Sequence, residues 1–257
     1  IFNQLTGLNQ KIGNYPGVTV DKTVGFIRIG EKEFNLIDLP GTYSLYPKSE
    51  DEVIAHRVLN GLGQEKPDFA LVILDACNLE RSLLLGTQVM DLGIPMAFVV
   101  NMKDLAHKKG IHIKTFELYK SLGVPLVLTD ARNNEGMDSI RQVMSEEKFE
   151  SPKPLLVSAD FANPELLNQV KQRFGFENSY QAFQLLVFGE YDKTLSIADK
   201  DWLNEKSNVF DFDSKKQQVR ETEARYVKIS EILKKAVSRD KVKSSNVTIS
   251  LDNVFLS

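Results

Sequence analysis

The chain has 257 residues, 42% of them hydrophobic, and this length allows one large domain or two modest ones, each with a core. A formal net charge of −3 and an isoelectric point near 5.8 leave no excess of positive charge to neutralise nucleic-acid phosphates, and the single cysteine excludes an internal disulfide. The sequence contains no run of about 20 apolar residues, so we expect no part of this chain to cross a membrane.

The first 150 residues alternate short apolar runs with stretches of helical periodicity, the order expected of an α/β fold. The apolar runs predict strands at 23–29, 33–38, 69–75, 96–101 and 126–129. Helical periodicity predicts helices at 50–62, 78–92, 115–122 and 137–147, which would cover a doubly wound, mostly parallel sheet. The first two strands are joined through Gly30, so we expect a hairpin that gives the sheet one antiparallel edge.

The character of the sequence changes after the segment 151–154, Ser-Pro-Lys-Pro, because strand-like runs thin out there. Helical periodicity then predicts helices at 165–174, 179–188 and 215–237. We therefore expect an α/β domain over 1–150, a small all-α helical subdomain over 151–238, and a terminal segment over 239–257 to which the sequence assigns no structure.

The segment Asp38-Leu-Pro-Gly41 follows a predicted strand, which places a carboxylate at the edge of the sheet where α/β proteins bind ligands. Asp38 there can hold Mg²⁺ through water, and Gly41 lets a backbone N–H approach a terminal phosphate. Taken alone, so short a pattern is more often an ordinary strand-to-turn signal.

The segment Asn101-Met-Lys-Asp104 also follows a predicted strand and carries groups that suit a guanine base. Asp104 can accept hydrogen bonds from both the ring N–H and the exocyclic amine of guanine, a pair that adenine cannot offer. We expect Asn101 to tie neighbouring loops together. Met102 stands where most GTPases have Lys, and its flexible thioether chain can still cover the flat base.

A third loop, Thr129-Asp130-Ala131, follows the strand at 126–129. We expect the Ala131 N–H to reach the carbonyl oxygen of guanine. Most related GTPases have Ser where Asp130 stands, so this loop departs furthest from the usual pattern.

Upstream of the hairpin, Gly17, Val18 and Thr19 lie in a loop rich in turn-forming residues. The Thr19 hydroxyl can ligate Mg²⁺ when a γ-phosphate is present, which would order the loop and release it on hydrolysis. In isolation Thr19 is more simply a strand-edge threonine. The order of all four motifs, each next to a predicted strand, is that of a GTPase, and this order outweighs the ambiguity of each motif.

A GTPase also needs a phosphate-binding loop of the form G-x-x-x-x-G-K-[ST]. The segment 1–7 looks like the first turns of the helix that such a loop opens. We therefore expect the loop immediately upstream of Ile1, in a longer protein of which this chain is a part.

The strings Asn14-Tyr-Pro-Gly-Val-Thr19 and Asp38-Leu-Pro-Gly-Thr-Tyr-Ser-Leu45 resemble the ferrous iron transport protein B family, whose members are transporters with a GTPase at the N-terminus. Asn78-Leu-Glu-Arg81 also matches this family, and Ala224-Arg-Tyr226 matches its helical subdomain. The likeness covers nearly the whole chain, and the first two strings are specific to this family among GTPases.

The resemblance implies a Ras-like fold for 1–150 and a helical subdomain that tempers nucleotide release. It implies GTP or GDP and Mg²⁺ as ligands and, as in many members, K⁺. The K⁺ ligands would be an Asn of the phosphate-binding loop and backbone carbonyls of Asn14, Tyr15 and Gly17.

The resemblance also implies a place in the cell and a set of partners. The chain would lie at the cytoplasmic face of the bacterial inner membrane, with 239–257 as a juxtamembrane segment and an iron-conducting membrane domain beyond Ser257. A small accessory iron-transport protein and further copies of the chain are the other expected partners, and nucleic acid is not one.

The position after Gly41 is Thr42, whereas many GTPases have there a Gln that orients the attacking water, and the first loop offers no arginine finger. We therefore predict slow GTP hydrolysis, with Thr19, Gly41 and Thr42 as the catalytic positions. Backbone groups near Thr19 and Gly41 would position the water.

Two other functions stay open. One is a degenerate sensor that binds guanine nucleotide without useful turnover and signals by occupancy alone. The other is an assembly GTPase acting on RNA, which the acidic isoelectric point and the lack of a basic, aromatic-bearing module disfavour. His56, His107 and His112 have no Cys-x-x-Cys or His/Glu cluster beside them, so we expect no structural metal site.

Overall fold

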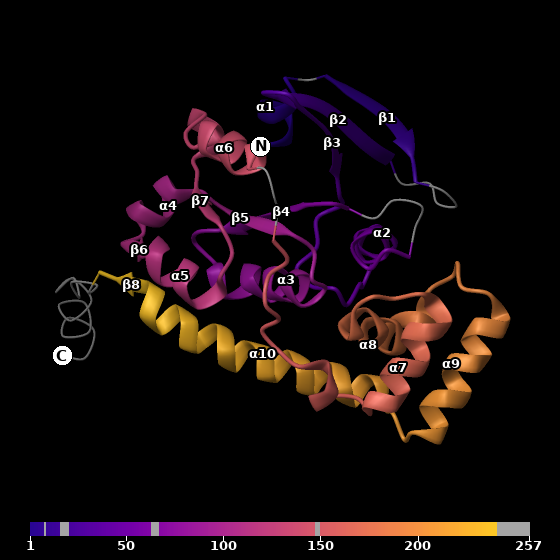
Figure 1. Cartoon of the computed structure of the whole chain (residues 1–257). Helices are drawn as coiled ribbons and strands as arrows, with labels where there is room; N and C mark the ends of the chain where they lie inside the picture. The colour runs from indigo at the N-terminus through magenta and orange to yellow at the C-terminus, as the bar shows by residue number, and fades with distance from the viewer. Residues whose placement is uncertain (8, 16–20, 63–66, 147–149, 241–257) are drawn as a thin grey trace, which may run out of the picture.

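The computed structural model describes residues 1–7, 9–15, 21–62, 67–146 and 150–240 (Figure 1). A short helix α1 (Phe2–Thr6) precedes an antiparallel sheet of β1 (Gln10–Asn14), β2 (Asp21–Ile29) and β3 (Lys32–Asp38). A parallel sheet contains β4 (Ala70–Asp75), β5 (Met96–Asn101) and β7 (Leu126–Leu128). Within the described ranges the two sheets share no ladder of hydrogen bonds.

The remaining elements are mostly helical. They are α2 (Glu50–Leu59), α3 (Leu79–Asp91), α4 (Lys103–Lys108), β6 (Ile111–Ile113), α5 (Thr115–Leu122), α6 (Met137–Ser145), α7 (Pro164–Phe174), α8 (Ser179–Phe188), α9 (Ile197–Val209), α10 (Ser214–Ala236) and β8 (Val237–Arg239). The predicted α/β class, the strands and helices, and the hairpin are confirmed, whereas β1, β6, β8, α4 and α9 had not been predicted.

Two tight features fix the antiparallel sheet. Gly30 takes φ 61° in the turn that joins β2 to β3, a left-handed conformation that glycine adopts without strain. A Cβ at Gly25 of β2 would lie 2.2 Å from Thr6 Cγ2, so the close approach of α1 to this sheet requires a glycine there.

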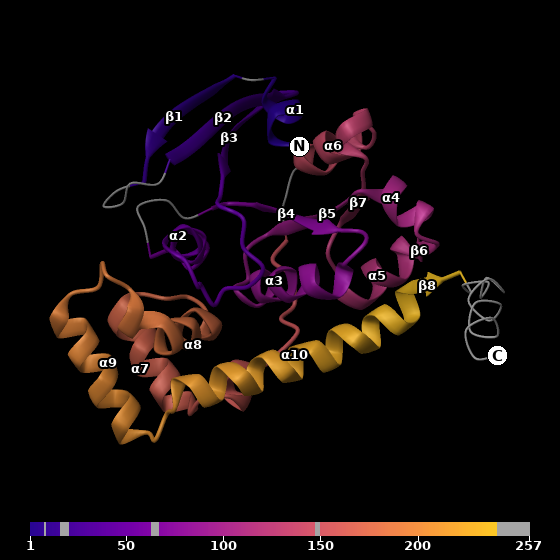
Figure 2. The same cartoon turned by 180° about the vertical axis from the view of Figure 1, so that it is seen from behind.

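The parallel sheet is covered on both faces, because side chains alternate along each strand. Val99 and Val127 pack in a cluster with residues of α1 and α6, whereas Phe98 and Val100 pack in a larger cluster with residues of α3 and α5. Figures 1 and 2 show α6 on one side of these strands and α3 and α5 on the other.

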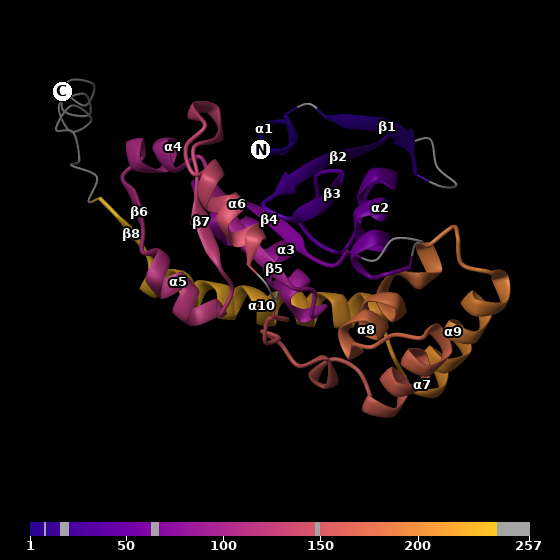
Figure 3. The same ribbon diagram turned by 45° about the horizontal axis from the view of Figure 1, so that its top comes forward.

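The helical part shares this larger cluster. Leu166 of α7, Phe183 of α8 and Ile229 of α10 belong to the same buried cluster as Leu74 of β4. In Figure 3, α10 runs along the molecule from the group α7–α9 to the short pair of β6 and β8. The helices after residue 150 are therefore packed onto the α/β part through one continuous core.

A buried polar network centred on Arg225 joins α10 to α3. Arg225 is fully buried and its guanidinium donates to the Asp91 carboxylate at 2.7 Å. Its Nε donates to Glu221 Oε1 at 2.8 Å, and the Tyr180 hydroxyl of α8 donates to the same oxygen at 2.7 Å. On the other carboxylate oxygen, Glu221 accepts from the Tyr46 hydroxyl at 2.9 Å.

The phenols of this network act as donors. Burial raises the pKa of Tyr46 and of Tyr180 well above the usual value of 10.0. For Tyr46, the negative charge of Glu221 raises the pKa further. Both hydroxyls therefore keep their protons across the physiological range and hydrogen-bond the buried carboxylate, which supports α8, α10 and the segment containing Tyr46 at once.

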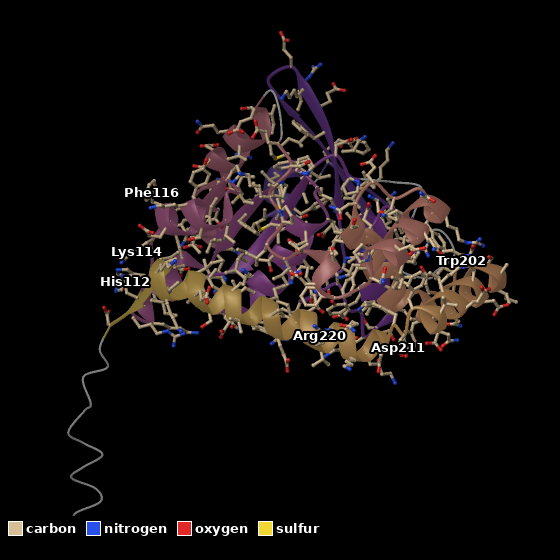
Figure 4. The ribbon with its side chains drawn as sticks, turned by 60° about the horizontal axis from the view of Figure 1, so that its bottom comes forward. His112, Lys114, Phe116, Trp202, Asp211 and Arg220 are labelled. Atoms are coloured by element: carbon tan, nitrogen blue, oxygen red, sulfur yellow. The ribbon has the colours of Figure 1, made fainter. Side chains whose placement is uncertain are left out.

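Replacing Arg225 tests the network, because Arg225→Ala leaves Asp91 and Glu221 buried without their counter-charge. We expect the free energy of unfolding, measured by urea denaturation, to fall by about 3–5 kcal/mol. The matched control is Arg220→Ala on the exposed face of the same helix (Figure 4), expected to change it by less than about 0.5 kcal/mol. A loss below about 1 kcal/mol for Arg225→Ala would show that the network does not hold α10.

The helix α2 is fixed against the turn that follows α8. Arg57 donates from Nη1 to both carboxylate oxygens of Asp192, at 2.8 and 2.7 Å, and the Asp192 side chain is fully buried. Burial alone would raise the pKa of Asp192, but the hydrogen bonds from Arg57 and Thr194 outweigh it and hold this pKa below its usual value.

His56 lies beside this ion pair in an apolar setting. Its ring is 1% exposed, its centroid lies 4.7 Å from that of Phe188, and neither ring nitrogen has a hydrogen-bond partner among the described residues. Burial lowers the pKa of His56 from 6.5 to about 4; the nearby charges of Asp192 and Arg57 act in opposite directions. The folded protein therefore holds His56 neutral.

The depressed pKa predicts an acid-sensitive interface between α2 and α8. The unfolded chain binds the His56 proton near pH 6.5 and the folded chain only near pH 4, so stability is present above pH 6.5 and falls as the pH decreases through this window. Between pH 7 and pH 5 we expect a loss of about 2 kcal/mol in the free energy of unfolding from this group. Urea denaturation at the two pH values measures this loss. The free energy of unfolding of His56→Leu should fall by about 2 kcal/mol less than that of the unsubstituted chain. His107→Leu, which removes an exposed imidazole, is the control; equal losses in all three proteins would contradict the assignment.

Candidate functional site

The carboxyl ends of β4, β5 and β7 lie together at one edge of the parallel sheet. Asp75 pairs in register with Asn101, and the N–H of Ala76 donates to the Asn101 carbonyl at 3.0 Å. Thr129 follows β7, and its N–H donates to the Val100 carbonyl at 2.8 Å. The loops that leave these strands are therefore held side by side, where α/β proteins bind ligands.

Asn101 connects the two predicted base-binding loops. Its Oδ1 accepts hydrogen bonds from the Thr129 hydroxyl and from the Ala131 N–H, both at 3.1 Å. The Lys103 N–H donates to the Thr129 carbonyl at 3.2 Å, which adds a backbone link. The structure thus brings Asn101, Thr129 and Ala131 together; the predicted contact of the Ala131 N–H with guanine stays a prediction.

Met102 turns the chain sharply between β5 and α4. Its backbone is left-handed, with φ 63° and ψ 35°, which is uncommon for a residue other than glycine and clusters at functional sites. Asp104 follows in the first turn of α4 with a side chain that is 31% exposed, and its ion-pair partner among the described residues is Lys108 at 3.7 Å. The carboxylate oxygens of Asp104 therefore stay accessible to a ligand.

Asp130 shapes the second of these loops. It is 3% exposed, and its carboxylate accepts from the N–H of Asn133 at 3.4 Å and from the Asn133 Nδ2 at 2.6 Å. These bonds cap the short 3₁₀ helix η1 (Ala131–Asn133). Any contribution of Asp130 to nucleotide binding would come through the shape of the loop, because its side chain is used within its own turn.

A pocket of about 160 Å³ lies between this sheet edge and the segment after Gly41. Its lining residues come from both sides: Thr42, Tyr43, Ile73, Leu74, Asp75, Ser82, Leu85, Asn101 and Met102. The pocket therefore places Thr42, a predicted catalytic position, across from the predicted base-binding loop.

The segment from Thr42 to Tyr46 is anchored to two helices. The Thr42 hydroxyl donates to the Ser44 carbonyl at 2.7 Å, so it is engaged within its own turn. The Leu45 N–H donates to Gln88 Oε1 of α3 at 2.7 Å, and Tyr46 reaches Glu221 of α10. The helical part and the segment next to the pocket are thereby connected through buried hydrogen bonds.

Tyr43 and Arg81 form a contact to which the sequence had given no role. The guanidinium carbon of Arg81, on α3, lies 3.7 Å from the centroid of the Tyr43 ring, which is 54% exposed. A cation–π contact at such a site contributes about 0.5–1 kcal/mol and fixes the wall of the pocket. The only sequence signal was that both residues fall in strings that resemble one family.

The predicted phosphate side of the site is described in part. Asp38 ends β3 with an exposed side chain, and its carbonyl accepts from the Tyr15 hydroxyl at 3.3 Å. A Cβ built on Gly41 would meet no atom within 4 Å. An exposed carboxylate is a ligand that Mg²⁺ prefers, so Asp38 fits the predicted metal.

The other residues predicted on this side lie in a less completely described stretch. Gly17, Val18 and Thr19 lie outside the described residues, and Asn14 is described here only by its backbone pairing with Asp21 in β1 and β2. Their predicted roles as Mg²⁺, K⁺ and nucleotide ligands stay predictions.

The described part of the chain lacks two further features. No group of three or more His, Cys, Asp and Glu side chains there is arranged to hold a metal ion. None of the helices in that part combines the length and apolar character that crossing a bilayer demands.

Comparison with known proteins finds one family. The family described as Ferrous iron transport protein B matches residues 1–144. A Fe(2+) transporter FeoB from Legionella pneumophila is 33% identical over 263 aligned residues, which cover 100% of this chain and 34% of that protein. A fusion of Fe(2+) transport protein A with Fe(2+) transporter FeoB, from Porphyromonas gingivalis, is 39% identical over 140 residues, 54% of this chain and 16% of that protein. The chain thus spans about a third or less of the length of these curated relatives.

Solved structures give the same result. The cytosolic domain of L. pneumophila FeoB superposes with a TM-score of 0.77 and 33% identity, covering 93% of this chain and 94% of that one. A mutant of S. thermophilus NFeoB bound to GDP superposes with a TM-score of 0.64 and 28% identity, covering 92% of this chain and 93% of that one.

Proposed function

Because this chain belongs to the ferrous iron transport protein B family, we propose that it binds guanine nucleotide, hydrolyses GTP slowly and thereby regulates or gates ferrous iron uptake. The iron would pass through a membrane domain of the same polypeptide. The observation that carries this proposal is the junction at Asn101, which ties the loops 101–104 and 129–131 at the sheet edge and leaves the Asp104 carboxylate accessible.

Asp104 is the residue proposed to select guanine. A carboxylate accepts from the ring N–H and the exocyclic amine at the same time, and each hydrogen bond to a charged group contributes about 1.5–3 kcal/mol. Met102 would lie against the base, while Asn101 holds the loop that carries Ala131. A GDP-bound relative supports the ligand class.

Replacing Asp104 tests the reading of the base. Asp104→Asn places an amide N–H donor where a carboxylate oxygen accepted a hydrogen bond from the base. We therefore expect the affinity for GDP to fall at least about 100-fold and the preference to shift from guanine toward xanthine. Fluorescent-nucleotide titration of protein that includes a phosphate-binding loop would measure both. Lys108→Ala, which removes the 3.7 Å ion-pair partner of Asp104, is the control and should change GDP affinity little. An unchanged ratio of guanine to xanthine affinity would contradict the proposed role of Asp104.

The phosphates are proposed to lie toward Gly41 and Asp38. Asp38 and Thr19 would hold Mg²⁺, which supplies charge neutralisation at the phosphates when bound. Gly17 and Val18 would contact nucleotide through their backbone, and the carbonyls of 14, 15 and 17 would hold K⁺.

The open edge of β4 supports a further strand beside it, leading to a phosphate-binding loop. The sequence of this strand, Ala-Leu-Val-Ile-Leu-Asp, is that of a fully buried strand, yet among the described strands it pairs only with β5, and Ile73 is 47% exposed. A strand on this edge would cover Ile73 and end at the pocket between Thr42 and Asn101.

The proposed slow hydrolysis of GTP rests on how the chain would position the attacking water. The Thr42 hydroxyl is engaged with the Ser44 carbonyl, so we propose that backbone groups near Thr19 and Gly41 orient the attacking water, and that Thr42 contributes mainly through its place in the turn. A degenerate sensor without useful turnover is the second candidate, and absence of single-turnover hydrolysis would favour it.

Two substitutions separate these roles. Thr42→Ala should leave single-turnover GTP hydrolysis within about tenfold of the unsubstituted rate, since no side-chain donor to the water is lost. Gly41→Ala should slow it by about 100-fold or more, because the added Cβ fits the protein without a clash but obstructs a terminal phosphate. A hundredfold loss in Thr42→Ala would overturn the proposed role of the backbone.

The remaining parts of the proposal concern organisation. Residues 1–150 would be the nucleotide-binding domain, 151–238 a helical subdomain that restrains nucleotide release, and 239–257 the connection to the membrane domain at the cytoplasmic face of the bacterial inner membrane. The relative fused to Fe(2+) transport protein A supports a small accessory protein as a partner, and self-association is a further candidate.

A further inference from the structure

Residues 107–120 and 234–240 meet at one end of the molecule, and we call them the basic end. β6 and β8 pair there, the Asp240 N–H donates to the Gly110 carbonyl at 2.8 Å, and the Lys114 N–H donates to the Ala236 carbonyl at 2.7 Å. Figure 4 shows His112, Lys114 and Phe116 beside the end of α10, at the opposite end of the molecule from Trp202 and Asp211. The chain leaves the described structure from this end.

The basic end has a charge opposite to that of the whole chain. It contains seven Lys and Arg residues, all exposed, against the two acidic residues Glu117 and Asp240, whereas the whole chain has a formal net charge of −3. Asp240 is also used by His112, whose Nε2 lies 2.9 Å from it. The excess of cations is therefore a local feature of this end.

The opposite end has no such excess of cations. Residues 190–213, which include α9, carry seven Asp and Glu residues and three lysines. When Lys215 and Lys216, which follow closely, are included, the count is seven acidic to five basic residues, so a negatively charged surface would favour the basic end over this one.

Two aromatic side chains are exposed within the basic end. Phe116 and Tyr119 of α5 are 70% and 52% exposed, and Lys120 is exposed beside them. Leu118 and Leu122, on the other face of the same helix, are 0% and 4% exposed and belong to the core. The core is thus complete without the two aromatic side chains, which are left free for another partner.

We propose that the basic end docks on the anionic headgroups of a lipid bilayer, with Phe116 and Tyr119 entering the interface. Exposed aromatic rings on the same surface as lysines favour the boundary between headgroups and acyl chains, where the rings are partly desolvated and the cations meet lipid phosphates. The exposed apolar side chains Ile197 and Val209 lie within 190–213, where cations are not in excess, and neither is aromatic. The inference rests on the proposed function only in placing the chain beside a membrane, and it requires no nucleotide.

Vesicle co-sedimentation of the 257-residue chain, without nucleotide, tests the proposal. We expect binding to vesicles of phosphatidylcholine with about one third phosphatidylglycerol, weak binding to phosphatidylcholine alone, and loss of binding in about 0.5 M salt. Lys114→Glu with Lys120→Glu should weaken binding at least about 25-fold, since loss of each lysine charge near an anionic surface is worth about a fivefold change and the new glutamates are repelled. Phe116→Ser with Tyr119→Ser should weaken it at least about fivefold at an unchanged unfolding temperature.

Matched variants at the other end control for net charge and hydrophobicity. Lys215→Glu with Lys216→Glu, in the first turn of α10, and Ile197→Ser with Val209→Ser should bind as the unsubstituted chain does. The proposal is overturned if the anionic vesicles do not bind at low salt, or if these controls lose as much binding as the variants of the basic end. A concentration-dependent dimer that Phe116→Ser with Tyr119→Ser dissociates, seen by light scattering without vesicle binding, would assign the surface to a second copy of the chain. A failed Asp104→Asn experiment leaves this result unaffected, since the assay contains no nucleotide.

Discussion

A guanidinium that is fully buried must find its counter-charges inside the protein, and this requirement fixes the position of α10. Arg225 meets Asp91 of α3 and Glu221 of its own helix, while Tyr180 and Tyr46 hydrogen-bond the same carboxylate. A shift of α10 relative to α3 would separate buried charges, which costs far more than loss of an apolar contact. Apolar burial supplies most of the attraction between the α/β part and the helical part, and the Arg225 network determines where α10 lies along α3.

The same network connects the helical part to the segment beside the pocket. Tyr46 lies only a few residues after Gly41, and Leu45 beside it is held by Gln88 of α3. The following helix, α2, is fixed to the turn after α8 through Arg57 and Asp192. Both ends of the segment between the pocket and α2 are therefore attached to helices. Movement of this segment would require buried hydrogen bonds to change partners, so its position and that of the helical part are linked.

The sequence predicted the elements whose hydrophobic pattern is strong. It missed those that form only through contacts with segments distant in the chain. The apolar runs of β4 and β5 and the helical periodicity of α3 are sufficient to predict these elements. β6 and β8 have three residues each and exist because they pair with each other, and α9 buries little besides Leu203. Likewise, the place of Asn101 and Asp104 at the end of a strand could be predicted from the sequence, and their roles stay predictions. Arg225 could not, because in a helix as charged as α10 only the fold distinguishes a buried arginine from a solvated one.

The pairing of β8 with β6 has a mechanical consequence. A pull on the chain beyond Asp240 would load the bonds from Asp240 to Gly110 and from Lys114 to Ala236, all of them between backbone atoms. Asp104 lies in the first turn of α4, and β6 begins three residues after that helix ends, so strain at Asp240 would reach the loop proposed to bind the base through one short helix. A linkage made of main-chain bonds does not depend on side-chain identity. Force could therefore pass from Asp240 to β6 whatever side chains these backbone positions carry.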